Sequence, residues 1–273
     1  MIRYHDIQSD YSEFRTNTIK TVKTAEFINL LKSRHLDNTS SIFEVIGKTT
    51  PIKIYLDVEY VPSDQVLKKI IDQFNDFFEK YFRFPVGPYV VTKNHFISKK
   101  KLHSYHIIFT KYKLRLFDVR NLIGKFVVRH AEFNDYIDLK CYSVDNLFRS
   151  IGQYTIDHYN NVRSNNFDNY HELYNLSEGR FYNKDELTNK LLEKSIIQGV
   201  DRCKEFLPKV PIQSQPIVNI LIDYKKNKGC NGKPVVHVKR EYDQIQTDLT
   251  QLKNLVFTLL LITILLTIII VIK

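Results

Sequence analysis

Residues 51–60 read PIKIYLDVEY, and their pattern predicts a β-strand with two different faces. Successive side chains of a strand point to opposite sides. The apolar face would carry Ile52, Ile54, Leu56 and Val58, and the polar face Lys53, Tyr55, Asp57 and Glu59. Asp57 and Glu59 would then share a face with Cα atoms roughly 6.5–7 Å apart. Their like charges suit either an exposed strand face or a site for Mg²⁺ or Mn²⁺, which prefer oxygen ligands.

The composition indicates a folded protein with an excess of positive charge. The chain has 273 residues, of which 43% are hydrophobic and 13% aromatic, enough for one substantial core. Its net charge of +10 favours a polyanionic partner, such as nucleic acid or an anionic membrane surface, although it also serves solubility. Cys141, Cys203 and Cys230 have no regular spacing, so the sequence indicates neither a disulfide framework nor a zinc ribbon.

The C-terminal segment has a different character. Residues 255–272, from Leu255 to Ile272, read LVFTLLLITILLTIIIVI and contain no charge and no helix breaker. A helix of this length spans about 27 Å, close to the thickness of a bilayer core. We therefore expect a single C-terminal transmembrane helix that tail-anchors the protein in a membrane, with the preceding chain in the cytoplasm. A buried core helix is the alternative.

Apolar periodicity predicts an α+β fold in which helices pack on one sheet. The expected helices cover residues 24–35, 64–82 and 116–130, and the expected strands cover 41–46, 51–60, 88–93, 103–110 and 137–142. Residues 1–22 are expected to be irregular. We place a catalytic domain at 1–155, a mixed α/β extension and linker at 156–250 and the anchor at 251–273. Within the extension we expect helices at 185–206 and 241–253 and short strands at 218–224 and 235–238.

Three of these expected strands each carry polar or charged residues within an apolar context. Asp57 and Glu59 are followed by Ser104 and His106, two residues apart within KLHSYHIIF. Next comes IDLKCYSVDNLFR, with Asp138 near its start and Arg149 at its end. The three patterns, in this order, resemble motifs of the archaeo-eukaryotic primase superfamily, in particular the primase-polymerase branch that includes enzymes of large DNA viruses. The resemblance covers residues 42–153.

This resemblance implies a DNA primase or a related nucleotidyltransferase that works by two-metal phosphoryl transfer. It implies that Mg²⁺ or Mn²⁺ is held by Asp57, Glu59 and Asp138. It implies that the triphosphate of the incoming nucleotide is bound by Ser104, His106, Arg149 and Lys101. The partners would be a nucleic acid template, nucleoside triphosphates and a replication subunit such as a helicase.

Two other hypotheses fit the same residues. The chain could be an inactive, membrane-anchored nucleic-acid-binding or scaffold protein with this fold, since Cys203, Cys230 and His237 are too sparse for the zinc module common in the family. It could also be a metal-dependent nuclease that uses the three acids, although a nuclease would not need His106. Tyr142 could stack on a base or pack in the core. Gln153 stands where family members often have a lysine.

Overall fold

The computed structural model describes residues 1–8, 19–35, 40–47, 49–94, 102–143, 146–153, 170–199 and 201–205. The chain divides into two units, Met1–Val218 and Asn219–Lys273, and all the described residues belong to the first. Several predictions fall outside the described residues: Lys101, the strands at 218–224 and 235–238, the helix at 241–253 and the transmembrane helix at 255–272. Among the described residues, no helix has both the length and the apolar character needed to cross a membrane.

The fold is α+β, as expected, but the described residues form two sheets instead of one. The helices are α1 (Thr24–Ser33), α2 (Asp64–Phe82), α3 (Leu116–Arg129) and α4 (Asn189–Ser195). The smaller sheet, in the order β2-β1-β3-β7, contains β1 (Ile2–Gln8), β2 (Lys20–Val22), β3 (Ser40–Ile46) and β7 (Asn146–Arg149). The larger sheet contains β4 (Pro51–Val61), β5 (Tyr89–Asn94), β6 (His103–Arg115), β8 (His171–Asn175), β9 (Arg180–Phe181) and β10 (Lys204–Glu205).

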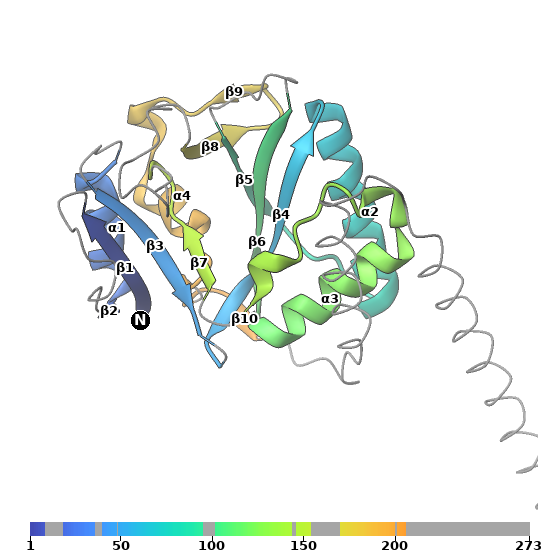
Figure 1. Ribbon diagram of the computed structural model, residues 1–273, viewed down its shortest axis with the longest axis horizontal. Coiled ribbons are helices and arrows are strands. Elements are labelled where there is room, and N and C mark those ends of the chain that lie inside the picture. The colour runs from blue at the N-terminus through green and yellow to red at the C-terminus, as the bar shows by residue number, and fades with distance from the viewer. Residues whose placement is uncertain are drawn as a thin grey trace, which may run out of the picture. The chain divides into compact units, whose positions relative to one another are not determined.

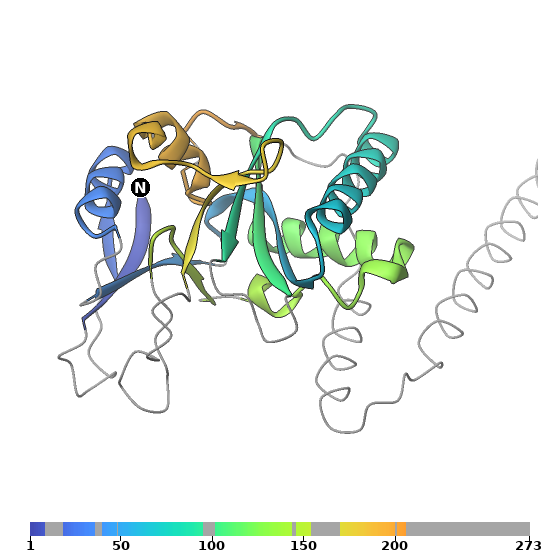
Figure 2. The same ribbon diagram turned by 90° about the horizontal axis from the view of Figure 1, so that it is seen from above.

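The two faces of β4 meet different neighbours. Helices α2 and α3 lie on one side of β4 and β6, and β7 of the smaller sheet lies on the other (Figures 1 and 2). The predicted apolar face is fully buried and packs toward the helices, where Phe74 of α2 contacts Phe109 of β6 with ring centroids 5.1 Å apart. On the other face, the ring of Phe148 of β7 lies 5.1 Å from that of Tyr55. The polar face of β4 is therefore enclosed between two sheets.

Local signals set the boundaries of α2 where the sequence placed them. The Ser63 side chain accepts a hydrogen bond from the Val66 N–H and caps the first turn. Arg83 ends the helix in the left-handed conformation, with φ of 67°. Most apolar residues of the predicted stripe are buried along one side of the helix, whereas Tyr81 near its end is 40% exposed.

Other elements differ from the sequence-based predictions. Residues 2–8 and 20–22 are strands rather than irregular chain. Residues 137–142 are not a strand: Ile137 makes one isolated bridge to Val58, and a 3₁₀ helix follows at Lys140–Tyr142. The helix expected at 185–206 is reduced to α4, because the chain after Ser195 turns inward to bind the two sheets. Strands β7 and β8 were not expected, and β8 to β10 complete the larger sheet.

Candidate functional site

Three of the predicted site residues form a row across the polar face of the larger sheet. Asp57 on β4 lies directly opposite His106 on β6 in an antiparallel pair. On the other side of β4, the Asp138 N–H donates to the Asp57 carbonyl oxygen at 2.9 Å, beside the Val58–Ile137 bridge. Residues directly opposite each other point to the same face. His106 and Asp57 therefore share one face, and Asp138 lies next to Asp57 in register on the other side of β4.

Glu59 and Ser104 extend this row at a break in the pairing of β4 and β6. Val58 pairs with Tyr105 and Val61 pairs with His103, so Glu59 and Tyr60 together lie opposite Ser104 alone. This arrangement is a β-bulge, which re-aims side chains at the edge of a site. Val58 and Val61 are both fully buried, whereas Glu59 is half-buried. Glu59 therefore stays on the side that regular alternation gives it, and the bulge adds Tyr60 as an extra residue before Val61.

His106 is an uncharged ring held between two aromatic neighbours. Its ring lies 4.5 Å from that of Phe148 and 4.0 Å from that of His171, nearly parallel to the second at 10°. Burial, together with the nearby Arg149 charge, lowers the pKa of His106 to about 3. Its Nε2 lies 3.8 Å from Asp57 Oδ1, longer than a hydrogen bond, and 8% of its side chain is exposed. His106 is therefore a neutral imidazole in contact with the carboxylate at the centre of the row.

Arg149 brings a cation to this row from the smaller sheet. It ends β7, next to the Phe148 that packs on His106. Burial lowers the pKa of the Arg149 guanidinium to about 10, while the carboxylates of Asp57 and Glu59 act in the opposite direction. Arg149 thus stays charged at neutral pH. A positive group from one sheet therefore compensates part of the charge of two acids of the other.

The carboxylates have the donor chemistry of a Mg²⁺ or Mn²⁺ site, but they do not form a ready-made ligand cluster. Asp57, Glu59 and Asp138 offer only oxygen donors, and Asp57 has 14% of its side chain exposed. Asp138 Oδ1 accepts a hydrogen bond from the Lys140 N–H at 3.0 Å. In the part of the chain that the structure describes, no group of three or more His, Cys, Asp and Glu side chains is arranged to hold a metal ion. The acids would have to turn toward an ion when it binds.

Two of the residues weighed in the sequence have structural roles. Tyr142 is buried, packs on Tyr55 with ring centroids 4.8 Å apart, and donates its hydroxyl to the Tyr55 carbonyl oxygen at 2.8 Å. Gln153 is fully buried; it accepts from the Ile42 N–H and donates to the Arg34 carbonyl oxygen, both at 3.1 Å. Neither side chain is available to a ligand.

His171 is a site residue that the sequence did not reveal. It is buried in β8, stacks on His106, and has Nδ1 3.2 Å from Thr92 Oγ1 and Nε2 3.5 Å from Ser104 Oγ. It therefore contacts both Ser104 and His106. A histidine about 65 positions after these two residues carries no local signal, because only the pairing of β8 with β5 brings it here.

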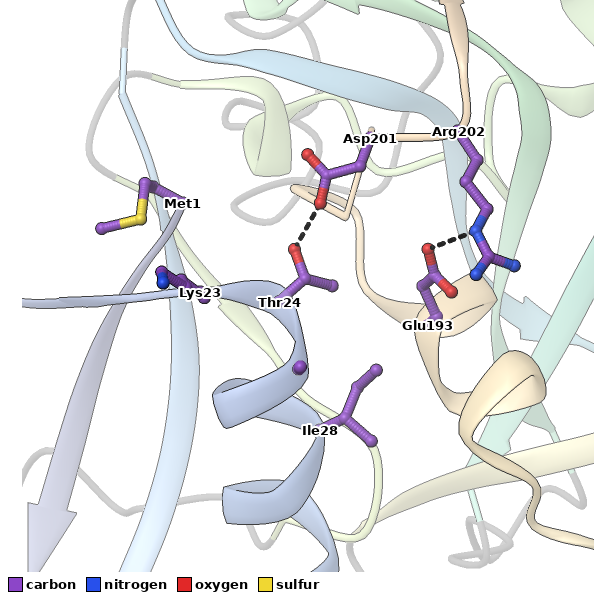
Figure 3. Close-up of a pocket in the computed structure, with 8 residues that line it drawn as sticks. Met1, Lys23, Thr24, Ile28, Glu193, Asp201 and Arg202 are labelled. Atoms are coloured by element: carbon purple, nitrogen blue, oxygen red, sulfur yellow. Dashed lines mark hydrogen bonds and ion pairs between the residues drawn. The ribbon is translucent and has the colours of Figure 1, made fainter.

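A pocket of about 480 Å³ lies elsewhere, between α1, α4 and the turn at Asp201 and Arg202 (Figure 3). Its acidic groups already have partners within it. Thr24 Oγ1 donates to Asp201 Oδ2 at 2.8 Å, and Arg202 Nε lies 3.5 Å from Glu193 Oε1. It contains none of the residues that the sequence singled out.

No protein-family model matches this chain, and no curated protein is significantly similar to it.

Proposed function

We propose that this protein is a primase-like nucleotidyltransferase that adds nucleotides to a nucleic acid strand by two-metal phosphoryl transfer. One observation carries the proposal. Asp57 has His106 on one side and Asp138 on the other, and the Arg149 charge acts on Asp57 from the opposite sheet. Phosphoryl transfer needs acidic groups for metal ions next to a group that binds phosphate. The acids of the larger sheet and Arg149 of the smaller sheet supply these two kinds of group on the enclosed face of β4.

Each residue has a distinct role in the proposal. Asp57, Glu59 and Asp138 would hold Mg²⁺ or Mn²⁺, which supplies charge stabilisation to the attacking and leaving oxygens. Arg149 would bind the triphosphate with a planar, permanently charged group. His106 is neutral and would donate an N–H to a phosphate oxygen without adding charge, and Ser104 would donate its hydroxyl. Lys101 would add a second cation.

The proposal also covers the setting of this activity. The net charge of +10 suits a nucleic acid template and nucleoside triphosphates. Residues 255–272 would tether the protein to a membrane, with the catalytic unit in the cytoplasm. A helicase or another replication subunit would then act on the same template.

Incorporation of labelled nucleotides into a primed template by the full-length chain in mild detergent tests this proposal. We expect extension with Mn²⁺ or Mg²⁺ and none after chelation. Shortening of the template instead would show a nuclease that uses the same acids. Template binding with neither extension nor shortening would show an inactive binding protein.

Replacing His171 with leucine is expected to raise the KM for nucleotides about tenfold, with a smaller change in kcat. Leucine is apolar and has no ring nitrogens, so His106 and Ser104 would lose the neighbour that orients them. Steady-state incorporation at varied nucleotide concentration separates the two parameters. His171→Gln keeps a polar group and should recover part of the loss. A Gln variant no better than Leu, or a loss confined to kcat, would contradict a positioning role.

A further inference from the structure

Tyr60 is an aromatic residue in an unusual place. It lies in the bulge of β4, next to Glu59 and opposite Ser104. It is 61% exposed, whereas the valines on either side of the bulge, Val58 and Val61, are fully buried. A strand of regular period two would have turned Tyr60 to the apolar side with Val58. The extra residue in β4 is what keeps Tyr60 out of the core and returns Val61 to it.

The backbone of Tyr60 is strained. Its φ is 59°, in the left-handed region that bulky residues seldom adopt. The other described non-glycine residue with positive φ is Arg83, which ends α2, where this conformation is ordinary. At Tyr60 the bulge in β4 imposes this conformation, at a kind of position where glycine is the usual residue. Strain of this kind persists only where the surrounding structure imposes it, and it concentrates at ligand-binding sites.

The ring lies beside the proposed metal ligands. The carboxylate of Glu59 raises the pKa of the Tyr60 hydroxyl, with contributions from burial and from Asp138. Glu59 precedes Tyr60 in the same bulge, on the row that also carries Asp57. An exposed aromatic face at this position is the feature that single-stranded nucleic acids use, because every base has a π-face that stacks on tyrosine.

We propose that Tyr60 is a stacking platform for a nucleobase at the edge of the acidic row, held out of the core by the bulge in β4. This inference rests on the proposed function and adds a contact to it. The base belongs either to a single-stranded nucleic acid or to a free nucleotide, and the chemistry of stacking is the same for both. A ring is needed, and the hydroxyl is not.

Binding of a fluorescent oligothymidylate to the full-length chain in detergent, without metal ions or triphosphates, tests the inference. We expect Tyr60→Ala to weaken binding about tenfold and Tyr60→Phe to leave it unchanged. Tyr60→Asn should weaken binding as Ala does, although asparagine accepts the left-handed backbone, so a loss cannot be attributed to a collapsed bulge. The matched control is Tyr89→Ala, because Tyr89 is 38% exposed and pairs with Phe109 on the helix-covered face.

Two further ligands identify the source of the base. An abasic oligomer of equal length keeps the phosphates, so wild type and Tyr60→Ala should bind it equally. Competition by dTTP shows whether a free nucleotide also depends on the ring. The inference is overturned if Tyr60→Ala matches wild type toward both oligothymidylate and dTTP, if Tyr60→Phe fails as Ala does, or if the abasic oligomer shows the same loss.

The outcome is distinguishable from that of the proposed function, because binding does not require turnover. A chain that binds bases through Tyr60 but does not extend primers keeps this inference and loses the proposed activity. A chain that extends primers, but whose binding of bases does not depend on Tyr60, keeps the proposed activity and loses this inference.

Discussion

Replacing Asp57 with asparagine is expected to lower metal-dependent nucleotide incorporation by about a thousandfold or more. Asparagine keeps the shape of the side chain and removes its charge. Asp57 is the centre of the row, opposite His106 and hydrogen-bonded through its backbone to Asp138. A metal ion contributes several kcal/mol of charge stabilisation to a phosphoryl transfer, and that contribution would be lost with its ligand. Initial rates of primer extension by the full-length chain measure the effect.

The controls separate catalysis from folding. Asp72→Asn removes an exposed acid from α2 and should leave the rate unchanged. Asp57→Asn should remain folded with at most a modest loss of thermal stability, because Glu59 still compensates the Arg149 charge. Glu59→Gln and Asp138→Asn should lower the rate in the same direction. An Asp57→Asn chain that extends primers as wild type does would rule out this residue as a metal ligand.

Replacing Lys53 with methionine is expected to lower the free energy of unfolding by about 3–5 kcal/mol. The Lys53 ammonium is buried and donates to the carbonyl oxygens of Glu193, Lys194 and Ile196 at 2.6, 3.2 and 2.8 Å. Beside it, the buried Glu44 carboxylate accepts from the N–H groups of Ile197 and Gln198. Methionine would leave three carbonyl groups without this donor and a buried acid without its cation. Urea unfolding measures the loss.

The effect of Lys53→Met should depend on pH. Burial raises the pKa of Glu44 to about 7 and lowers that of Lys53 to about 8. Stability from a raised carboxyl pKa is present below its unfolded value, near 4.5, and is lost as pH rises through the folded value. Without the Lys53 charge, the folded pKa of Glu44 would rise further. The difference between wild type and Lys53→Met should therefore be smaller at pH 5 than at pH 8.

Lys113→Met provides the matched control for the Lys53 substitution. Lys113 lies directly opposite Lys53 on β6 but is half-buried rather than enclosed. Its loss should change stability by no more than about 0.5 kcal/mol. Equal losses for the two variants, or a Lys53→Met effect that does not vary with pH, would contradict the role assigned to the buried pair.

Local periodicity was enough to predict the parts of the fold that depend on neighbouring residues. The apolar stripe of residues 64–82 gave α2 at its observed boundaries. The alternation in residues 51–60 predicted a strand with two different faces, and the pairing of β4 with β6 then brings Asp57 opposite His106. Asp138 lies beside Asp57 without the strand that was expected, through the single bridge at Ile137.

Long-range contacts decide what the sequence could not predict. Glu44, Lys53 and Gln153 are polar or charged residue types that usually lie at the surface, yet all three are buried. Their hydrogen-bond partners come from chain segments far away in sequence, which local periodicity does not reveal. His171 joins His106 only through the pairing of β8 with β5. The second sheet escaped prediction for the same reason, since β7 is four residues long and gains its place by pairing with β3.

Glu44 of β3 and Lys53 of β4 belong to different sheets, and both form hydrogen bonds to the same short segment, residues 193–198. This segment therefore connects the two sheets at Lys53, about 13 Å along β4 from Asp57. Separating the two sheets would break several buried polar contacts at once, so we expect the position of Arg149 relative to the acids to be set before a ligand binds. Discrimination among ligands by size would then be built into the resting molecule and would not wait for closure.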